Sequence, residues 1–316
     1  MYQILHQYLS DHQLITIGIL VTFFITFLLL KHPFSFLPQD QGRDYAVNGQ
    51  LSKGKIRGVG LPLVLCFVIM AFVFIPVDKE FIVYAILILA MMLSGYLDDA
   101  AETPWSDYKK GLIDFVLSAV AVIAFANFNG TTILIGPMTV EIPKVLFIIL
   151  GIILFWVSIN VTNCTDGVDG LCGGLSVVVM VSYTILFHEQ MEKYGALSFL
   201  FAAVLLAYLY FNSSPSSMLM GDAGSRALGF YIAILALKSG QPLLYLLLAG
   251  VFIVDGGLGL VKVFLLRFLK ISILKNTRTP IHDHVRKNRG WSDTQVVIRF
   301  IIFQVLLAIL AYGFVV

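Results

Sequence analysis

Long apolar runs, each bounded by polar residues or by Gly and Pro, recur along the whole chain. A helix needs roughly 20 apolar residues to cross the hydrocarbon core of a bilayer, and about ten runs approach that length. They lie at 13–31, 59–76, 80–97, 111–127, 143–161, 172–187, 196–211, 225–239, 241–269 and 296–315. The pattern predicts an all-α polytopic membrane protein with about ten transmembrane helices, formed as one domain over residues 1–316.

Two stretches depart from this pattern of long helices. Residues 129–143, NGTTILIGPMTVEIP, alternate in polarity around Gly136-Pro137 and predict a small β-hairpin. The run 241–269 is too long for one straight crossing, and Asp255-Gly256-Gly257 interrupts it. We therefore expect a break or bend there.

Composition agrees with a membrane location. The chain of 316 residues is 59% hydrophobic and 13% charged, with a mean hydropathy of +0.90, whereas soluble domains carry about 25% charged residues. No basic segment precedes the run 13–31 and no small-residue cleavage site follows it, so we expect a retained span and not a signal peptide. Three unpatterned cysteines, Cys66, Cys164 and Cys172, indicate neither a disulfide framework nor a zinc site.

The basic residues are distributed very unevenly between the two sides that alternate loops define. Seventeen of the 21 lysines and arginines fall on one side, and Lys79, Lys144, Lys193 and Lys238 fall on the other. Cytoplasmic loops of membrane proteins carry the excess of basic residues. We therefore expect the first side to be cytoplasmic, and both termini and the hairpin to lie outside.

Four polar segments all fall on the predicted cytoplasmic side. They are SGYLDDA (94–100), NVTNCTDGVDGL (160–171), MLMGDAGSRALGF (218–230) and TPIHDHVRKNRGW (279–291). Carboxylates gathered at a membrane boundary repel one another unless cations or a metal ion neutralise them. All-oxygen ligands favour a hard ion such as Mg²⁺, which binds one or two carboxylates together with water and substrate phosphate. This arrangement points to phosphoryl chemistry.

Asn160, Asn163, Asp166 and Asp169 follow one another at intervals of three. On a helix this spacing places the four side chains on one face. Gly167 and Gly170 interleave with them, which is a poor choice for a helix that serves stability alone. The alternatives are a polar packing seam here, a solvated helix end at Asp98 and Asp99, and a helix cap at Asp222.

The segment that contains His282, Asp283 and His284 lacks enough ligands for zinc. It lies in a loop with four basic residues: Arg278, Arg286, Lys287 and Arg289. Such a cationic surface suits an anionic substrate or lipid headgroups.

The order DD, NxxNxTDGxDGL, GDxGSxxLG and PIHxH…GW resembles the polyprenyl-phosphate N-acetylhexosamine-1-phosphate transferases, of glycosyltransferase 4 type. The resemblance runs from about residue 40 to the end. Thr165, TPIHDH and GW…VVIRF resemble the branch of the family that transfers phospho-N-acetylmuramoyl-pentapeptide.

This resemblance implies Mg²⁺-dependent transfer of phospho-MurNAc-pentapeptide from UDP-MurNAc-pentapeptide to undecaprenyl phosphate. The products would be UMP and lipid I, in the first membrane step of peptidoglycan synthesis. The resemblance also implies a homodimer in the bacterial plasma membrane with a cytoplasmic active site, surrounded by membrane lipid. We expect no nucleic acid as a macromolecular partner.

The resemblance assigns roles to particular residues. It implies catalytic roles for Asp98, Asp99, Asp222 and His282, and Mg²⁺ ligation by Asp222 with Asp166 as a second ligand. It implies substrate contacts for Lys110, Asn160, Asn163, Asp166, Asp169, Asp283 and His284. Within this set, Asp98 would deprotonate the lipid phosphate, Asp169 would contact uracil, and Lys110 would lie near the pyrophosphate.

The chain departs from the family pattern at three places. Asp283 replaces the middle histidine of a triple, and Glu102 replaces a lysine. The family's KxGTPTMGG appears only as SKGKIRGVG, so either Lys53 or Lys55 could take the lysine's place.

Two other functions compete with this assignment. A sister enzyme would use UDP-GlcNAc in place of the muramoyl donor. A secondary transporter would carry ionisable residues near the bilayer midplane, for which Asp255 is the candidate. Direct attack by the lipid phosphate and a covalent aspartyl-phosphate intermediate both remain open.

Overall fold

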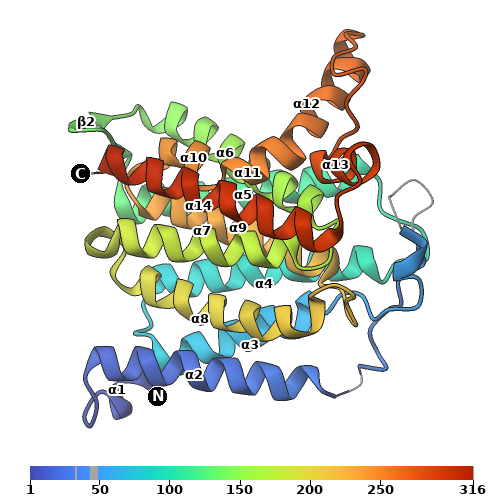
Figure 1. The fold of residues 1–316 in the computed structure, drawn as a ribbon. Coiled ribbons are helices and arrows are strands. Elements are labelled where there is room, and N and C mark those ends of the chain that lie inside the picture. Colours follow the sequence, from blue (N-terminus) through green and yellow to red (C-terminus); the bar gives the residue numbers. More distant parts are fainter. Residues whose placement is uncertain (33, 43–48, 316) are drawn as a thin grey trace.

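The computed structural model describes residues 1–32, 34–42 and 49–315. Most of its long helices run side by side in one bundle (Figure 1). The α-helices are α1 Tyr2–Leu5, α2 Asp11–Leu30, α3 Gly60–Phe74, α4 Lys79–Asp99, α5 Asp107–Asn129, α6 Lys144–Thr165, α7 Leu171–Leu186, α8 His188–Asn212, α9 Gly221–Lys238, α10 Tyr245–Leu248, α11 Gly250–Phe252, α12 Leu258–Phe264, α13 Ile281–Arg289 and α14 Asp293–Val315. Short 3₁₀ and π turns are η1 Gly49–Ser52, η2 Pro242–Leu244, η3 Ile253–Gly257 and η4 Leu265–Leu269.

Each apolar run that the sequence predicts as a helix is helical in the structure. By length and composition, six described helices could cross a membrane: α2, α4, α5, α6, α8 and α14. The bent pair Pro242–Leu248 and Gly250–Leu269 could add a seventh, while α3 and α7 are shorter apolar helices. A multi-pass helical protein is therefore confirmed, and the count of ten spans and the outside location of the termini stay predictions.

The run 241–269 is broken, but earlier than predicted: the chain bends by 70° between Pro242–Leu248 and Gly250–Leu269, at Ala249. At η3 the chain forms a π-helical turn, and there Gly256 packs so tightly against α6 that a Cβ would come within 2.6 Å of the Val161 carbonyl oxygen. Beyond this point α12 leans away from the bundle (Figure 1).

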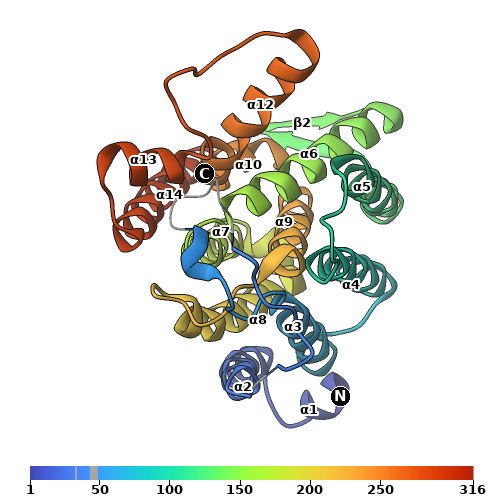
Figure 2. The same ribbon diagram turned by 90° about the vertical axis from the view of Figure 1, so that its right-hand side faces the viewer.

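Helix α9 occupies the centre of the bundle, between α4, α6, α7 and α3 (Figure 2). Every residue from Gly221 to Leu237 is buried. Glycines on two neighbours allow close contact: a Cβ on Gly60 of α3 would lie 2.0 Å from the Gly224 nitrogen, and one on Gly95 of α4 would lie 2.3 Å from the Asp222 carbonyl oxygen. This packing places the end of α4 beside the start of α9.

The predicted hairpin is present as β1 Thr132–Ile135 paired antiparallel with β2 Met138–Glu141. It lies at the end of the bundle where α9 terminates, because Leu134 N–H donates to the Gly240 carbonyl. Three of the four lysines predicted to lie on the outer side are found at this end. Lys144, Lys193 and Lys238 contact polar side chains at the ends of α4 and α5. The basic residues therefore separate between the two ends of the bundle in the way the loop pattern predicts.

Candidate active site

Three carboxylates and a lysine from separate helices meet at the opposite end of the bundle. Asp98 and Asp99 end α4, Asp222 begins α9, and Lys110 lies in the first turn of α5. Lys110 Nζ forms an ion pair with Asp98 and lies 3.3 Å from Asp222 Oδ2. The structure thus brings together Asp98, Asp99, Asp222 and Lys110, as predicted.

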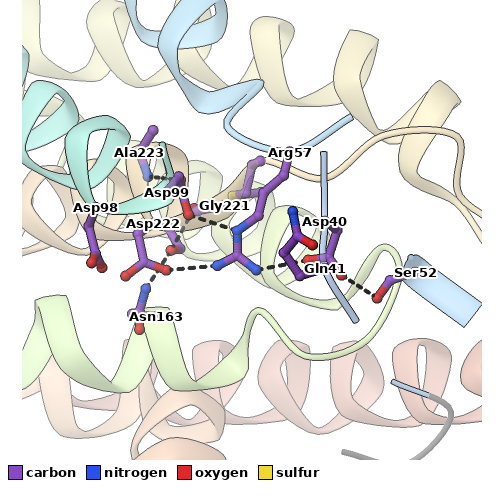
Figure 3. A network of polar contacts seen from close by, with 12 residues as sticks. Asp40, Gln41, Ser52, Arg57, Asp98, Asp99, Asn163, Gly221, Asp222 and Ala223 are labelled. Atoms are coloured by element: carbon purple, nitrogen blue, oxygen red, sulfur yellow. Dashed lines mark hydrogen bonds and ion pairs between the residues drawn. The ribbon is translucent and has the colours of Figure 1, made fainter. Parts of the chain in front are cut away.

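Arg57, from the loop before α3, joins these carboxylates, as Figure 3 shows. Its Nε donates to Asp99 Oδ1 at 2.7 Å and its Nη2 donates to Asp222 Oδ1 at 3.2 Å. Its Nη1 donates to Asp40 Oδ2 at 2.9 Å. Burial lowers the pKa of this guanidinium, but the charges of Asp99 and Asp222 outweigh that effect and raise the pKa above its ordinary value. Arg57 is a site residue that the sequence analysis missed.

Asp40 anchors the outer end of Arg57. Its Oδ1 accepts hydrogen bonds from Ser52 Oγ at 2.7 Å and from the Gly42 N–H at 2.8 Å. Burial raises the pKa of this carboxyl, but the hydrogen bonds from Ser52, Arg57 and Gly42 more than offset it, so that the pKa lies below its ordinary value. Asp40 therefore stays ionised and holds Arg57 from the side away from Asp222.

The start of α9 has a backbone that only glycine adopts easily. Gly221 has a φ of +67°, and a Cβ there would lie 2.3 Å from Asp99 Oδ2. The same carboxylate oxygen accepts a hydrogen bond from the Ala223 N–H at 3.1 Å. Asp222 makes no cap, because the N-cap is Met220 and the first-turn Ala223 N–H is satisfied by Asp99. The alternative that Asp222 is a helix cap is wrong, and it is an ion-pairing residue.

The two neighbouring aspartates of α4 have different partners. Asp98 is buried, pairs with Lys110, and accepts a hydrogen bond from the Trp105 N–H at 2.8 Å. Asp99 faces Arg57 and the start of α9. Adjacent helical residues point about 100° apart, which agrees with the expectation of separate roles. The alternative of a solvated helix end is wrong for both.

The run of Asn160, Asn163, Asp166 and Asp169 does not lie on one helix. Helix α6 ends at Thr165, Asp166 is its C-cap, and a turn leads to α7 at Leu171. Gly170, with φ of +84°, makes this turn possible, so the expectation of a single helical face is wrong beyond Asp166.

The members of this run reach different neighbours. Asn163 Nδ2 donates to Ser225 Oγ on α9 at 2.9 Å, whereas Asn160 donates to the carbonyl of Trp156 in its own helix. Asp169 Oδ2 accepts from the Ser216 N–H at 2.9 Å and lies 3.6 Å from Lys55 Nζ. Of the two candidate lysines, Lys55 contacts Asp169, a residue predicted to bind the substrate, whereas Lys53 is exposed.

His282 fastens α13 to the bundle. Its backbone N–H donates to Asp255 Oδ1 at 2.7 Å, and its Nδ1 lies 2.8 Å from Asp255 Oδ2. Its Nε2 packs on the turn after α6, since a Cβ on Gly167 would come within 2.5 Å of that atom. Asp255 is fully engaged in this contact, which does not favour a transporter site.

The other two residues of the histidine segment make contacts close to α13. Asp283 Oδ1 lies 3.4 Å from Arg286 Nη1, and His284 Nδ1 accepts a hydrogen bond from the Arg278 N–H at 3.3 Å. Their predicted substrate contacts stay predictions. Glu102, which replaces a family lysine, is exposed in the loop after α4.

Residues 81–240, half of the chain, match the sequence profile of glycosyl transferase family 4. The chain belongs to glycosyl transferase family 4. This stretch of the family 4 chain contains Asp98, Asp99, Lys110 and Asp222, so the ion-paired cluster lies largely inside the region shared with the family.

Curated relatives extend the match over nearly the whole family 4 chain. A protein of Treponema pallidum (strain Nichols) is 39% identical over 94% of this chain and 88% of its own length. A protein of Dictyoglomus thermophilum is 28% identical over 92% of this chain and 94% of its own. One of Clostridium botulinum (strain Eklund 17B / Type B) is 31% identical over 75% and 74%. All three bear the name phospho-N-acetylmuramoyl-pentapeptide-transferase. Together with the family match, these relatives identify the chain as a phosphoglycosyl transferase.

The donor set of this family 4 site suits Mg²⁺. Its ion-paired network consists of four carboxylates and two cations: Asp40, Asp98, Asp99 and Asp222 with Arg57 and Lys110. With all groups ionised its net charge is therefore −2, which one divalent cation would neutralise. No group of three or more His, Cys, Asp or Glu side chains suited to a metal ion occurs among residues 1–32, 34–42 and 49–315. Mg²⁺ needs one or two protein carboxylates and completes its octahedron with water and phosphate.

Proposed function

We propose that this transferase moves phospho-MurNAc-pentapeptide from UDP-MurNAc-pentapeptide to undecaprenyl phosphate, releasing UMP and forming lipid I. The convergence of Asp98, Asp99 and Asp222 on Arg57 and Lys110 at one end of the bundle is the observation that carries the proposal. The names of the relatives support the muramoyl donor. We further expect a homodimer in the bacterial plasma membrane, with this end of the bundle in the cytoplasm.

The proposed reaction is attack of a lipid phosphate oxygen on the β-phosphorus of the donor, with UMP as the leaving group. Both reactants are anions, so neutralising their charge lowers the barrier. Arg57 and Lys110 supply two cations between the carboxylates and can turn toward incoming phosphate oxygens. Asp222 would hold Mg²⁺, with Asp166 as the predicted second ligand, and the ion would stabilise charge on the diphosphate.

Asp98 acts on the lipid phosphate mainly by position. A phosphate monoester has a second pKa near 6, so this nucleophile is already mostly ionised at neutral pH. Asp98 is buried and fixed by the Trp105 N–H, and it holds Lys110 where a phosphate could bind. A covalent aspartyl-phosphate route is the alternative, and it would leave labelled phosphate on the protein in a rapidly quenched reaction with labelled donor.

The polyprenyl chain needs an apolar route to this end of the bundle. Phe264 and Phe268 are 55% and 60% exposed on the leaning segment α12–η4, with ring centroids 5.1 Å apart. They form our candidate wall for the chain. Phe252, on the same bent run of the sequence, is fully buried and does not belong to this wall.

An assay of UMP release from the purified enzyme tests the proposal. With undecaprenyl phosphate and Mg²⁺, we expect UMP from UDP-MurNAc-pentapeptide and none from UDP-GlcNAc, and we expect EDTA to stop the reaction. UMP from UDP-GlcNAc alone would assign the sister reaction, and no UMP from either donor would favour the transporter.

The variant Asp222→Ala should lose turnover in this assay. Arg57 and Lys110 would lose the carboxylate that they share, and Mg²⁺ would lose its proposed ligand. Asp107→Ala removes an exposed aspartate near the same end and should keep near-normal activity. Activity of the Asp222 variant close to that of the control would refute the role of Asp222.

A further inference from the structure

A cationic cavity of about 420 Å³ is lined by residues that the proposed chemistry does not use. It is largely open to solvent and is bounded by α12, the loop 270–280 and α13. Four basic side chains line it with Thr277 and Asn288: Lys262, Lys275, Arg278 and Lys287. Asn and Thr complete the lining, so the described residues of the cavity wall include no carboxylate and no apolar side chain. We call it the basic cavity.

The wall of the basic cavity is held by internal hydrogen bonds. Lys262 Nζ, on α12, donates to the carbonyls of Leu274 at 3.0 Å and Thr277 at 2.8 Å, which draws the loop onto the helix. The Arg278 N–H donates to His284 Nδ1 and joins the same loop to α13. These bonds leave the ammonium groups of Lys275 and Lys287 exposed at the cavity, and neither forms an ion pair with a described residue. Two strongly hydrated cations are thus available to an incoming anion.

The basic cavity is tied to the segment that is predicted to surround the nucleotide. Thr279, in its wall, lies three residues before His282, which packs on Gly167 between Asp166 and Asp169. The turn η3, which leads into α12, packs against both α6 and α13, at the end of the bundle that Figure 2 looks onto. A group attached to the sugar of a bound nucleotide donor could therefore extend toward the cavity.

We propose that the basic cavity binds the carboxylates of the peptide carried by the donor, an inference that rests on the proposed function. A peptide with a free C-terminus carries at least one carboxylate, and an extended pentapeptide spans at most about 17 Å. Lysine ammonium groups attract carboxylates and can follow a flexible chain, since they bind as point charges. The cavity would thus favour a peptide-bearing donor over a nucleotide sugar without one.

The test compares the double variant Lys275→Ala/Lys287→Ala with the wild type, in neutral phosphatidylcholine vesicles. We expect the KM for UDP-MurNAc-pentapeptide to rise about fivefold, the effect of losing two partly exposed charge pairs, with kcat unchanged. The inhibition constant of UDP-MurNAc, which lacks the peptide, should not change. The control Lys31→Ala/Lys79→Ala removes the same charge from exposed positions outside the cavity wall and should leave both constants unchanged.

Three outcomes would overturn the inference while leaving the proposed function intact. They are an unchanged KM for the pentapeptide donor, an equal loss of affinity for UDP-MurNAc, and a defect confined to vesicles that contain phosphatidylglycerol. The last would assign the basic cavity to an anionic lipid headgroup. A wild-type enzyme that releases no UMP from the pentapeptide donor would instead refute the proposed function, and the inference with it.

Discussion

Arg57 illustrates what a single side chain does at this site. A guanidinium is planar and presents five donors in a rigid fork, and here the fork meets Asp40, Asp99 and Asp222 at once. These carboxylates come from three distant parts of the chain. Arg57 therefore fixes the loop before α3 against α4 and α9, in addition to placing positive charge at the site.

Asp40 predicts a dependence of stability on pH. Its pKa is lowered in the folded protein, so its ionised form stabilises the fold above the unfolded pKa of about 4. That contribution is lost as the pH falls through the lower folded pKa. We expect Asp40→Asn to melt at a lower temperature than the wild type at pH 7, and the difference to shrink below about pH 4.

Thermal unfolding in detergent at pH 7 and pH 3 measures this effect. Asp107→Asn, at a position 86% exposed in its side chain, is the matched control and should melt like the wild type at both pH values. A pH-independent difference for the Asp40 variant would contradict ionisation as the cause.

Residue types and spacing predicted part of the site. Asp98, Asp99, Asp222 and Lys110 stand in runs at helix ends, where charge in an oily chain is conspicuous. Arg57 belongs to a loop with several basic residues, and no periodicity distinguishes the one that turns inward. Its role depends on where the loop packs, which local sequence does not encode.

At the scale of elements, glycine contacts set the separation of α4 and α9. A Cβ at Gly95 would lie 2.3 Å from a backbone oxygen of Asp222, which cannot move like a flexible side chain. We expect Gly95→Ala to push α4 away from α9 and reduce UMP release about tenfold or more, since small displacements of reacting groups are costly. Gly111→Ala, on α5, meets no described atom within 4 Å and should be near-normal. Equal activity of the two variants would contradict this role of Gly95.

A buried ion pair joins α5 to α9 one turn below the site. Arg226 Nη2 donates to Asp114 Oδ1, and both side chains are 3% exposed. Removing one partner leaves an uncompensated buried charge, which typically costs about 3–5 kcal/mol, whereas replacing both by apolar residues is often neutral. We expect Asp114→Leu to lower the melting temperature strongly and Asp114→Leu/Arg226→Leu to recover most of it.

Thermal unfolding of both variants in detergent, beside the wild type, checks this pair. A double variant no more stable than Asp114→Leu would show that packing, and not the unpaired charge, causes the loss.

Helices and their ends were predictable where hydrophobic periodicity and helix-breaking residues mark them in the sequence. Apolar runs predicted the helices, whereas Asp255-Gly256-Gly257 marks a π-helical turn and the ninth run bends earlier, at Ala249. The interval of three from Asn160 to Asp169 suggested a continuous helix. The structure ends α6 at Thr165, so Gly167 and Gly170 outweigh the spacing there.

At the scale of the whole molecule, charge is segregated between the two ends of the bundle. Lysines near the hairpin pair with side chains at the ends of α4 and α5, while the carboxylate network and the basic cavity share the other end. Alternate loops predicted this segregation, because helices of similar length carry the chain from end to end. The number of spans was harder to predict, because α3 and α7 are apolar but short.

The ion pairs of Arg57 and Lys110 with Asp222 have a consequence for ligand binding. Each carboxylate oxygen already faces one of these cations, so an arriving diphosphate competes for the cations and a metal ion competes for the carboxylate. Bound diphosphate draws the cations away from Asp222 and so favours the metal ion, and a bound metal ion likewise frees the cations for diphosphate. Linkage requires that each ligand raise the affinity for the other by the same factor. Calorimetric titration of Mg²⁺ should accordingly give a several-fold lower Kd in the presence of UDP, and Asp222→Asn should abolish that synergy.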